Sequence, residues 1–141
     1  MREIRDEIRE VIFRGKRADN GEWIEGSLLG IDWCDKPSTY SIAPNTPVSV
    51  FYSVIPETVG QFTGLTDKNG KRIFEGDIVS LVKHDSLIYK VVYVPCRYEL
   101  VNSKGVNCFV LDIYKSENIE VIGNIHDNPE LLGGENNGIN R

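Results

Sequence analysis

Two Asn-Gly pairs punctuate this chain, and each lies beside short runs of apolar and β-branched residues. Asn20-Gly21 separates the run 11–14 from the run 22–29, and Asn69-Gly70 precedes the run 73–79. Asn and Gly both tolerate positive φ, so each pair predicts a tight turn between antiparallel strands. Gly26 lies inside the second run and predicts a β-bulge there.

Strand-like runs continue along the rest of the chain, with turn signals about every 8–12 residues. The run 48–55 is β-branched and aromatic throughout, which predicts one continuous strand. Further runs cover 39–42, 80–84, 87–94, 106–113 and 119–125. There is no strand–helix–strand alternation and no repeat of fixed period, which disfavours a doubly wound nucleotide-binding sheet. The pattern predicts a mainly β fold, a short-stranded barrel or sandwich.

The two ends differ from this middle part. Residues 1–10 form a charged extension in which Ile4 and Ile8, with Ile12, recur every four residues. That spacing predicts either a short helix packed on the domain or on a neighbouring chain, or a frayed end. Asn128-Pro129 predicts one helical turn capped by Asn128. Residues 133–141 predict a flexible tail. A chain of 141 residues holds one domain or at most two very small ones, and we expect a single β domain over 11–132.

Composition limits the class of protein. Hydrophobic residues make up 40% and charged residues 26%, as in soluble globular proteins. The 16 basic and 21 acidic residues give a net charge of -5, which disfavours a general polyanion binder. The basic residues gather before position 18 and again at Lys68, Lys71 and Arg72, but neither group forms a clean stripe. The sequence shows no leader-like apolar stretch and no membrane span, so we expect a cytoplasmic protein.

The cysteines and histidines offer little chemistry. Cys34, Cys96 and Cys108 form no CxxC pair, and their odd number makes a poor disulfide framework, so we expect buried, reduced thiols. His84 and His126 each precede an aspartate, but adjacent residues of a strand point to opposite faces. Cys96 beside His84 or His126 stays open as a nucleophile pair, although nothing in the sequence supplies a third, orienting group.

The carboxylates offer one further alternative. Glu75 and Asp77 stand two residues apart around Gly76, so they would share a strand face and could form an acid pair or a metal site. The simpler interpretation is a turn or bulge at Gly76-Asp77 that leads into a strand. No phosphate-binding loop, HExxH or GxSxG motif is present. We therefore predict no catalytic, cofactor-binding or metal-binding residues and no cofactor.

Three stretches together resemble one known family. Residues 11–16 with 20–23 resemble its opening, and 119–125 with 128–132 resemble its end. Residues 59–79, VGQFTGLTDKNGKRIFEGDIV, resemble its hallmark. The chain is thus similar to the YopX-like family of small bacteriophage and prophage proteins, with 1–10 as an addition and His126 where the family more often has tyrosine. The resemblance implies a β-rich fold with SH3-like barrel character and a phage setting. It implies no enzyme activity and no site residues.

Three function classes therefore stand. The first is a non-catalytic protein–protein interaction or assembly module that self-associates, indicated by the acidic charge and by aromatic residues beyond the needs of a small core. Those aromatic residues are Trp23, Trp33, Tyr52 and Tyr93. The second is a small β-barrel that binds nucleic acid. The third is a hydrolase or metal enzyme, which would use Cys96, His84, His126, Glu75 or Asp77.

Overall fold

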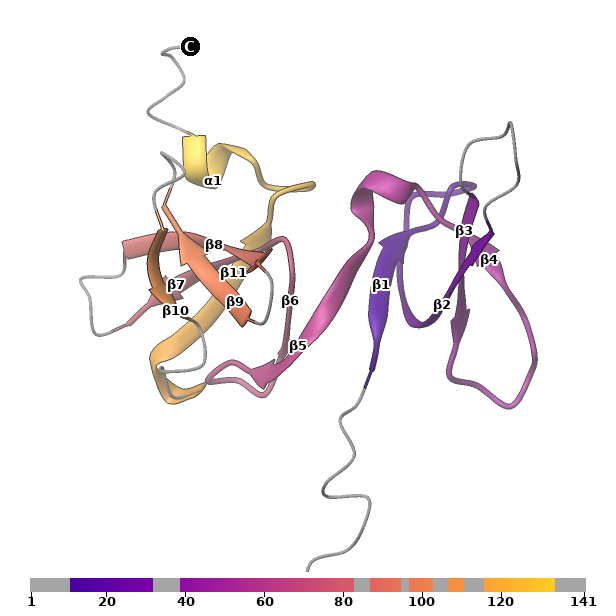
Figure 1. Ribbon diagram of the computed structural model, residues 1–141, viewed down its shortest axis with the longest axis horizontal. Helices are drawn as coiled ribbons and strands as arrows, with labels where there is room; N and C mark the ends of the chain where they lie inside the picture. Colours follow the sequence, from indigo (N-terminus) through magenta and orange to yellow (C-terminus); the bar gives the residue numbers. More distant parts are fainter. Residues whose placement is uncertain are drawn as a thin grey trace, which may run out of the picture. The chain divides into compact units, whose positions relative to one another are not determined.

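The computed structural model describes residues 11–31, 39–82, 87–94, 97–102, 107–110 and 116–133 (Figure 1). These residues form mainly antiparallel β-strands, which confirms the prediction of a mainly β fold. The chain divides into two compact units, Met1–Gly64 (unit 1) and Leu65–Arg141 (unit 2). The expectation of a single β domain over 11–132 stays a prediction. The predicted helix at 1–10 and the tail beyond Gly133 lie outside the described residues.

Unit 1 contains antiparallel strands in the order β4-β3-β2-β1-β5. Strand β5 carries the boundary between the units: its first residues pair with β1, and its last residues lead into the hallmark turn of unit 2. The elements are β1 (Phe13–Lys16), β2 (Trp23–Ile31), β3 (Thr39–Pro44), β4 (Tyr52–Ser53), the 3-10 turn η2 (Pro56–Thr58) and β5 (Gly60–Thr66).

The first Asn-Gly pair forms the predicted turn between β1 and β2. Gly21 has a φ of 76°, and its amide donates to the Arg17 carbonyl at 2.9 Å. The predicted bulge at Gly26 is wrong, because Gly26 pairs in register with Phe13 on one side and Pro44 on the other. Glycine is needed there for close approach, since a Cβ would overlap the backbone carbonyl of Ala43.

The predicted strand over 48–55 is much shorter in the structure. Only Tyr52 and Ser53 pair with β3, and the residues just before Tyr52 are not part of a strand. The chain then crosses to β1, where Val54 forms a bridge with Arg17. β-Propensity describes how a side chain suits a sheet, but it cannot supply the neighbouring strand.

Thr58 fastens the 3-10 turn η2 to β1. Its hydroxyl oxygen accepts a hydrogen bond from the Lys16 amide at 2.9 Å and donates to the Ile55 carbonyl at 2.6 Å. Thr58 is buried, so both hydrogen bonds are shielded from water. The turn thereby positions β5 to pair with β1, with Phe13 opposite Gln61.

Unit 2 has a second antiparallel sheet in the order β10-β9-β8-β7-β11. The predicted strand at 87–94 is confirmed as β8, whereas β9 was not predicted. Its alternation of charged Arg97 and Glu99 with apolar residues is a period-2 signal in only five residues. The elements are β6 (Arg72–Phe74), β7 (Asp77–Leu81), β8 (Leu87–Val94), β9 (Arg97–Val101), β10 (Asn107–Val110), the 3-10 turn η4 (Ser116–Asn118), β11 (Ile119–Asn124) and the helix α1 (Glu130–Gly133).

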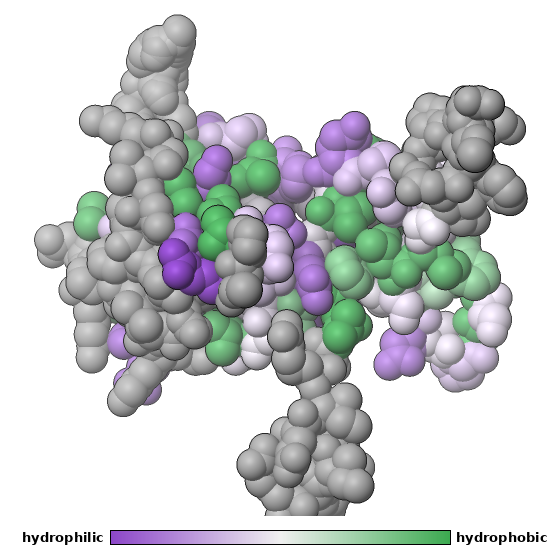
Figure 2. All heavy atoms as spheres, viewed as in Figure 1, coloured by the Kyte–Doolittle hydropathy of each residue, from purple (hydrophilic) through white to green (hydrophobic). Residues whose placement is uncertain are grey.

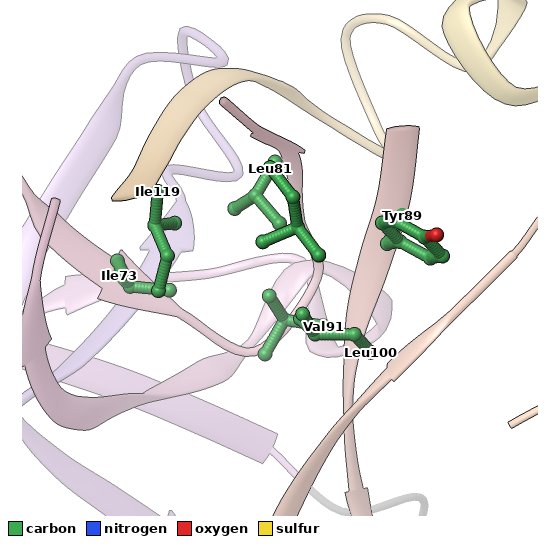
Figure 3. Packing of buried hydrophobic residues seen from close by; sticks show 7 residues of the cluster. Ile73, Leu81, Tyr89, Val91, Leu100 and Ile119 are labelled. Carbon is green, nitrogen blue, oxygen red and sulfur yellow. The ribbon is translucent and has the colours of Figure 1, made fainter. Parts of the chain in front are cut away.

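The core of unit 2 lies on one face of this sheet. The side chains of seven buried residues converge from five strands (Figure 3). They are Ile73, Val79, Leu81, Tyr89, Val91, Leu100 and Ile119. The helical turn predicted after Asn128 is confirmed as α1, but the Asn128 side-chain oxygen accepts from the Asn124 amide at 3.2 Å rather than capping that helix.

The two units have the same strand connectivity, although the sequence contains no repeat of fixed period. In unit 1, β1 to β4 follow one another in the sheet, a 3-10 turn comes next, and β5 returns to pair with β1. In unit 2, β7 to β10 do the same, η4 follows, and β11 returns to pair with β7. The described strands form two sheets and no closed barrel, so the SH3-like barrel character stays a prediction.

Candidate functional site

The hallmark segment is organised around the buried carboxylate of Asp67. One carboxylate oxygen accepts hydrogen bonds from the amides of Asn69 at 2.8 Å and Lys71 at 2.9 Å, which shapes the second Asn-Gly turn. The other oxygen accepts from the Val121 amide at 2.9 Å. Burial raises the pKa of Asp67, but these three hydrogen bonds and the Lys71 charge outweigh burial and lower it below its usual range. Asp67 is therefore a structural group.

The second carboxylate of the hallmark also has a structural role. Asp77 is only 1% exposed, and its Oδ2 accepts a hydrogen bond from the Phe74 amide at 2.7 Å across a turn in which Gly76 has a φ of 92°. Glu75 lies in that turn and not in β7. The predicted sharing of a strand face by Glu75 and Asp77 is therefore wrong, and the turn interpretation is confirmed.

Among the histidine and cysteine candidates, only His126 has a described side chain, so a pairing of Cys96 with either histidine stays a prediction. His126 is half-buried in a turn whose shape comes from Asn124: its Oδ1 accepts from the amides of His126 and Asp127, each at 2.9 Å. Cys34, His84 and Cys96 lie outside the described residues. Cys108 lies in β10, but its side chain is outside the description as well. Among the described residues, no three His, Cys, Asp or Glu side chains could hold a metal ion.

The basic residues of β1 lie against aromatic rings of unit 1. The Arg14 guanidinium lies 4.7 Å from the centroid of the Trp23 ring, and the Lys16 ammonium lies 5.5 Å from the same centroid. Strand register explains this, because Lys16 pairs with Trp23 and positions two apart share a face. Arg14 is 8% exposed, so its charge is largely withdrawn from the surface.

Arg17 is similarly engaged at the end of β1. Its guanidinium lies 4.1 Å from the centroid of the Tyr52 ring and donates to both carboxylate oxygens of Asp19, at 3.0 and 2.7 Å. These hydrogen bonds raise the pKa of Arg17 and lower that of Asp19. In unit 2, Lys68 lies 3.6 Å from Glu120. Among the described basic residues, Arg14, Lys16, Arg17 and Lys68 therefore form local pairs and ring contacts.

The outer side of β2, β3 and β4 carries a different kind of surface. Register places Leu29, Ser41 and Ser53 in one row across the three strands. Phe51 and Ile55 alternate with Ser53 along the chain and point to the same side, since Val54 between them is buried. Leu29 is 44%, Phe51 57% and Ile55 38% exposed.

We call this surface the uncharged face, because none of its members is charged. Figure 2 shows hydrophobic side chains gathered over β2, β3 and β4. The neighbouring row on the same side begins with Glu25, which marks the border. No local pattern indicates this face, because it joins three separate stretches of the chain. Its members are Ser27, Leu29, Ser41, Ala43, Phe51, Ser53 and Ile55.

The aromatic residues singled out in the sequence have separate environments. Trp23 and Tyr52 are half-buried against the cations described above. Tyr93 of β8 is 54% exposed and meets Tyr98 of β9 edge to face, with ring centroids 5.3 Å apart. Trp33 lies outside the described residues. Each of the described rings therefore has its own local partner.

Comparison with known proteins places the chain in a family. No curated protein matches it. The chain is similar to the crystal structure of protein EF1440 from Enterococcus faecalis, with 26% sequence identity, a TM-score of 0.55 and coverage of 89% of this chain and 99% of that one. None of the helices in the described residues is long and apolar enough to cross a membrane. Residues 12–133 match the family described as YopX protein, and the chain therefore belongs to the YopX family.

Proposed function

We propose that this chain is a non-catalytic protein-binding module that acts in the cytoplasm of a bacterial host and is encoded by a phage or prophage. The observation that carries the proposal is the uncharged face of unit 1. Leu29, Phe51 and Ile55 expose large apolar side chains there without a charged neighbour inside the face. Contiguous exposed apolar surface is typical of an interaction site.

The energetic case rests on the apolar area. Fully burying a side chain of this kind contributes roughly 1.5–3 kcal/mol relative to leaving it exposed. A partner that covers Leu29, Phe51 and Ile55 would recover part of that amount for each, and the serines of the face can hydrogen-bond across the contact. The hallmark carboxylates are weaker candidates for a functional site than the uncharged face, because Asp67 and Asp77 already accept hydrogen bonds from backbone amides.

We also propose that each unit has SH3-like barrel character. Support comes from the shared connectivity: four successive strands, a 3-10 turn and a fifth strand that returns to the first. In unit 1, the bridge between Val54 and Arg17 brings the chain after β4 back to β1, as closure requires. An experimental structure in which β4 stays far from the end of β1 would contradict this proposal.

Nucleic-acid binding is the second candidate, and one observation favours it. Arg14 and Lys16 lie on Trp23, and modules that bind single strands combine cations with stacking rings. The pI near 5.1 and the local pairing of Arg17 with Asp19 weigh against it. A shift in DNA or RNA mobility that weakens with salt, and that Trp23→Ala removes, would favour this candidate over the first.

Affinity capture from bacteria that express the chain tests protein binding at the uncharged face. The wild type is compared with Leu29→Glu and with Leu87→Glu, a matched change at an exposed apolar residue of unit 2. We expect defined proteins, including further copies of this chain, to be retained by the wild type and by Leu87→Glu and lost with Leu29→Glu. Equal recovery from both variants, or no bound protein, would overturn the proposal.

A further inference from the structure

We infer that the occupant of the uncharged face is a second copy of this chain, in a two-fold symmetric dimer. The inference rests on the proposed function, because it names the partner of the same surface. In such a dimer both copies use the same face, so the residues of the face must be complementary in charge and shape to the same set of residues in the other copy.

Charge is the first argument for self-pairing. The chain carries a net charge of -5, so two copies repel each other over most of their surfaces. The uncharged face removes that repulsion at the contact, since neither copy brings a carboxylate or an ammonium into it. Serine hydroxyls both donate and accept hydrogen bonds, so Ser27, Ser41 and Ser53 can each pair with the same residues of the other copy.

Shape is the second argument. The middle strand of the face, β3, presents small residues, Ser41 and Ala43, whereas the large side chains come from β2 and from the residues on either side of β4. Leu29 stands on the β2 side, and Phe51 and Ile55 stand on either side of Ser53. Two sheets that pack face to face lie about 10 Å apart with their strands roughly aligned. A two-fold axis near Ser41 then lets the large side chains of each copy fill the shallow centre of the other.

The face also has a border that would form the rim of a dimer. Glu25 precedes the uncharged positions of β2 by one outward-facing step, and in the strand register it lies opposite Arg14 of β1. A polar rim around an apolar centre is the usual anatomy of a protein interface. Because both copies are acidic, added salt should screen their repulsion and strengthen the dimer, whereas salt weakens contacts that depend on opposite charges.

The test measures the mass of the full-length chain by sedimentation equilibrium between about 1 and 200 µM, the range in which weak dimers of standard size dissociate. We compare the wild type with Ser41→Glu, Ser41→Lys and an equimolar mixture of the two. Like charges opposed across the axis should weaken dimerisation by about 100-fold in each variant alone. The mixture should restore it, since the two variants then bring opposite charges together.

Leu87→Glu of unit 2 serves as the matched control and should dimerise as the wild type does. Thermal unfolding of each variant shows whether it keeps the wild-type fold. The mixture is a second check, because misfolded variants would not regain dimerisation when they are mixed. Dimers of Ser41→Glu as tight as the wild type, or no recovery in the mixture, would overturn the inference. A monomeric wild type that still captures another protein, lost with Leu29→Glu, would overturn self-pairing alone. A monomeric wild type that captures nothing would overturn the proposed function too.

Discussion

The carboxylate of Asp67 and the amide of Val121, 54 residues apart in the sequence, are joined by a hydrogen bond of 2.9 Å. This bond connects two of the three segments that carry the family resemblance, the hallmark 59–79 and the closing segment that starts at 119. The same carboxylate also shapes the Asn69-Gly70 turn through the amides of Asn69 and Lys71. One buried side chain therefore gives the hallmark a structural explanation that requires no catalytic role.

Asp67→Asn should destabilise the protein by about 3 kcal/mol, because hydrogen bonds to a charged group contribute about 1.5–3 kcal/mol each. In the asparagine variant, the side-chain NH2 group would replace one acceptor oxygen. It would then face a backbone N–H, and two donors cannot form a hydrogen bond with each other. Urea unfolding followed by circular dichroism measures the change. Asp19→Asn is the matched control, since Asp19 is exposed and its ion pair is with Arg17, two residues away, and we expect no measurable loss of stability from it. Equal stabilities of the two variants would contradict the structural role of Asp67.

The stability of the wild type should fall in acid because of the same carboxylate. The pKa of Asp67 is lower in the folded protein than its ordinary value of 3.8, so the carboxylate contributes stability at pH values above the unfolded pKa. That contribution is lost as the pH falls from about 5 through the folded pKa. Unfolding free energies at several pH values should show the gap between wild type and Asp67→Asn shrinking below about pH 4. A gap that stays constant down to pH 3 would refute this assignment.

Thr58→Val should destabilise unit 1 by about 2 kcal/mol, because it leaves the partly buried Lys16 amide without its acceptor. The substitution keeps the side-chain shape, so lost hydrogen bonds and not a cavity account for the effect. Thr46→Val is the control, since the Thr46 hydroxyl donates to the Val48 carbonyl at an exposed position. We expect thermal unfolding to separate the two variants clearly, and similar midpoints would argue against η2 being fastened to β1 by Thr58.

Gly26→Ala should lower the free energy of unfolding by about 3 kcal/mol, at the upper end of the usual range for overpacking. The new methyl group would overlap the backbone of Ala43, which cannot move aside as a side chain could. The register of Gly26 with both Phe13 and Pro44 leaves no room for β2 to shift. Ser27→Ala, one residue later and exposed, should change stability little. A folded Gly26→Ala variant with wild-type stability would show that β2 and β3 lie farther apart than described.

Features that depend on local geometry were predicted well from the sequence. The Asn-Gly turns are confirmed because positive φ is a property of single residues, as Gly21 and Gly70 show. The corner at Gly76-Asp77 is confirmed for the same reason, and the long apolar run of β8 has the predicted bounds, Leu87–Val94. Features that depend on a partner strand were predicted poorly, which explains the missed β9 and the shortened strand at Tyr52-Ser53.

The sequence by itself determined that this chain is a β protein, where its tight turns lie and which family it resembles. Only the tertiary structure decided that two units repeat one connectivity, that Asp67 holds Val121, and that Leu29, Ser41 and Ser53 share an uncharged face. The physical reason is that turn conformation depends on neighbouring residues. Strand order and register instead depend on contacts between distant segments, whose side chains become neighbours only after the sheet has formed.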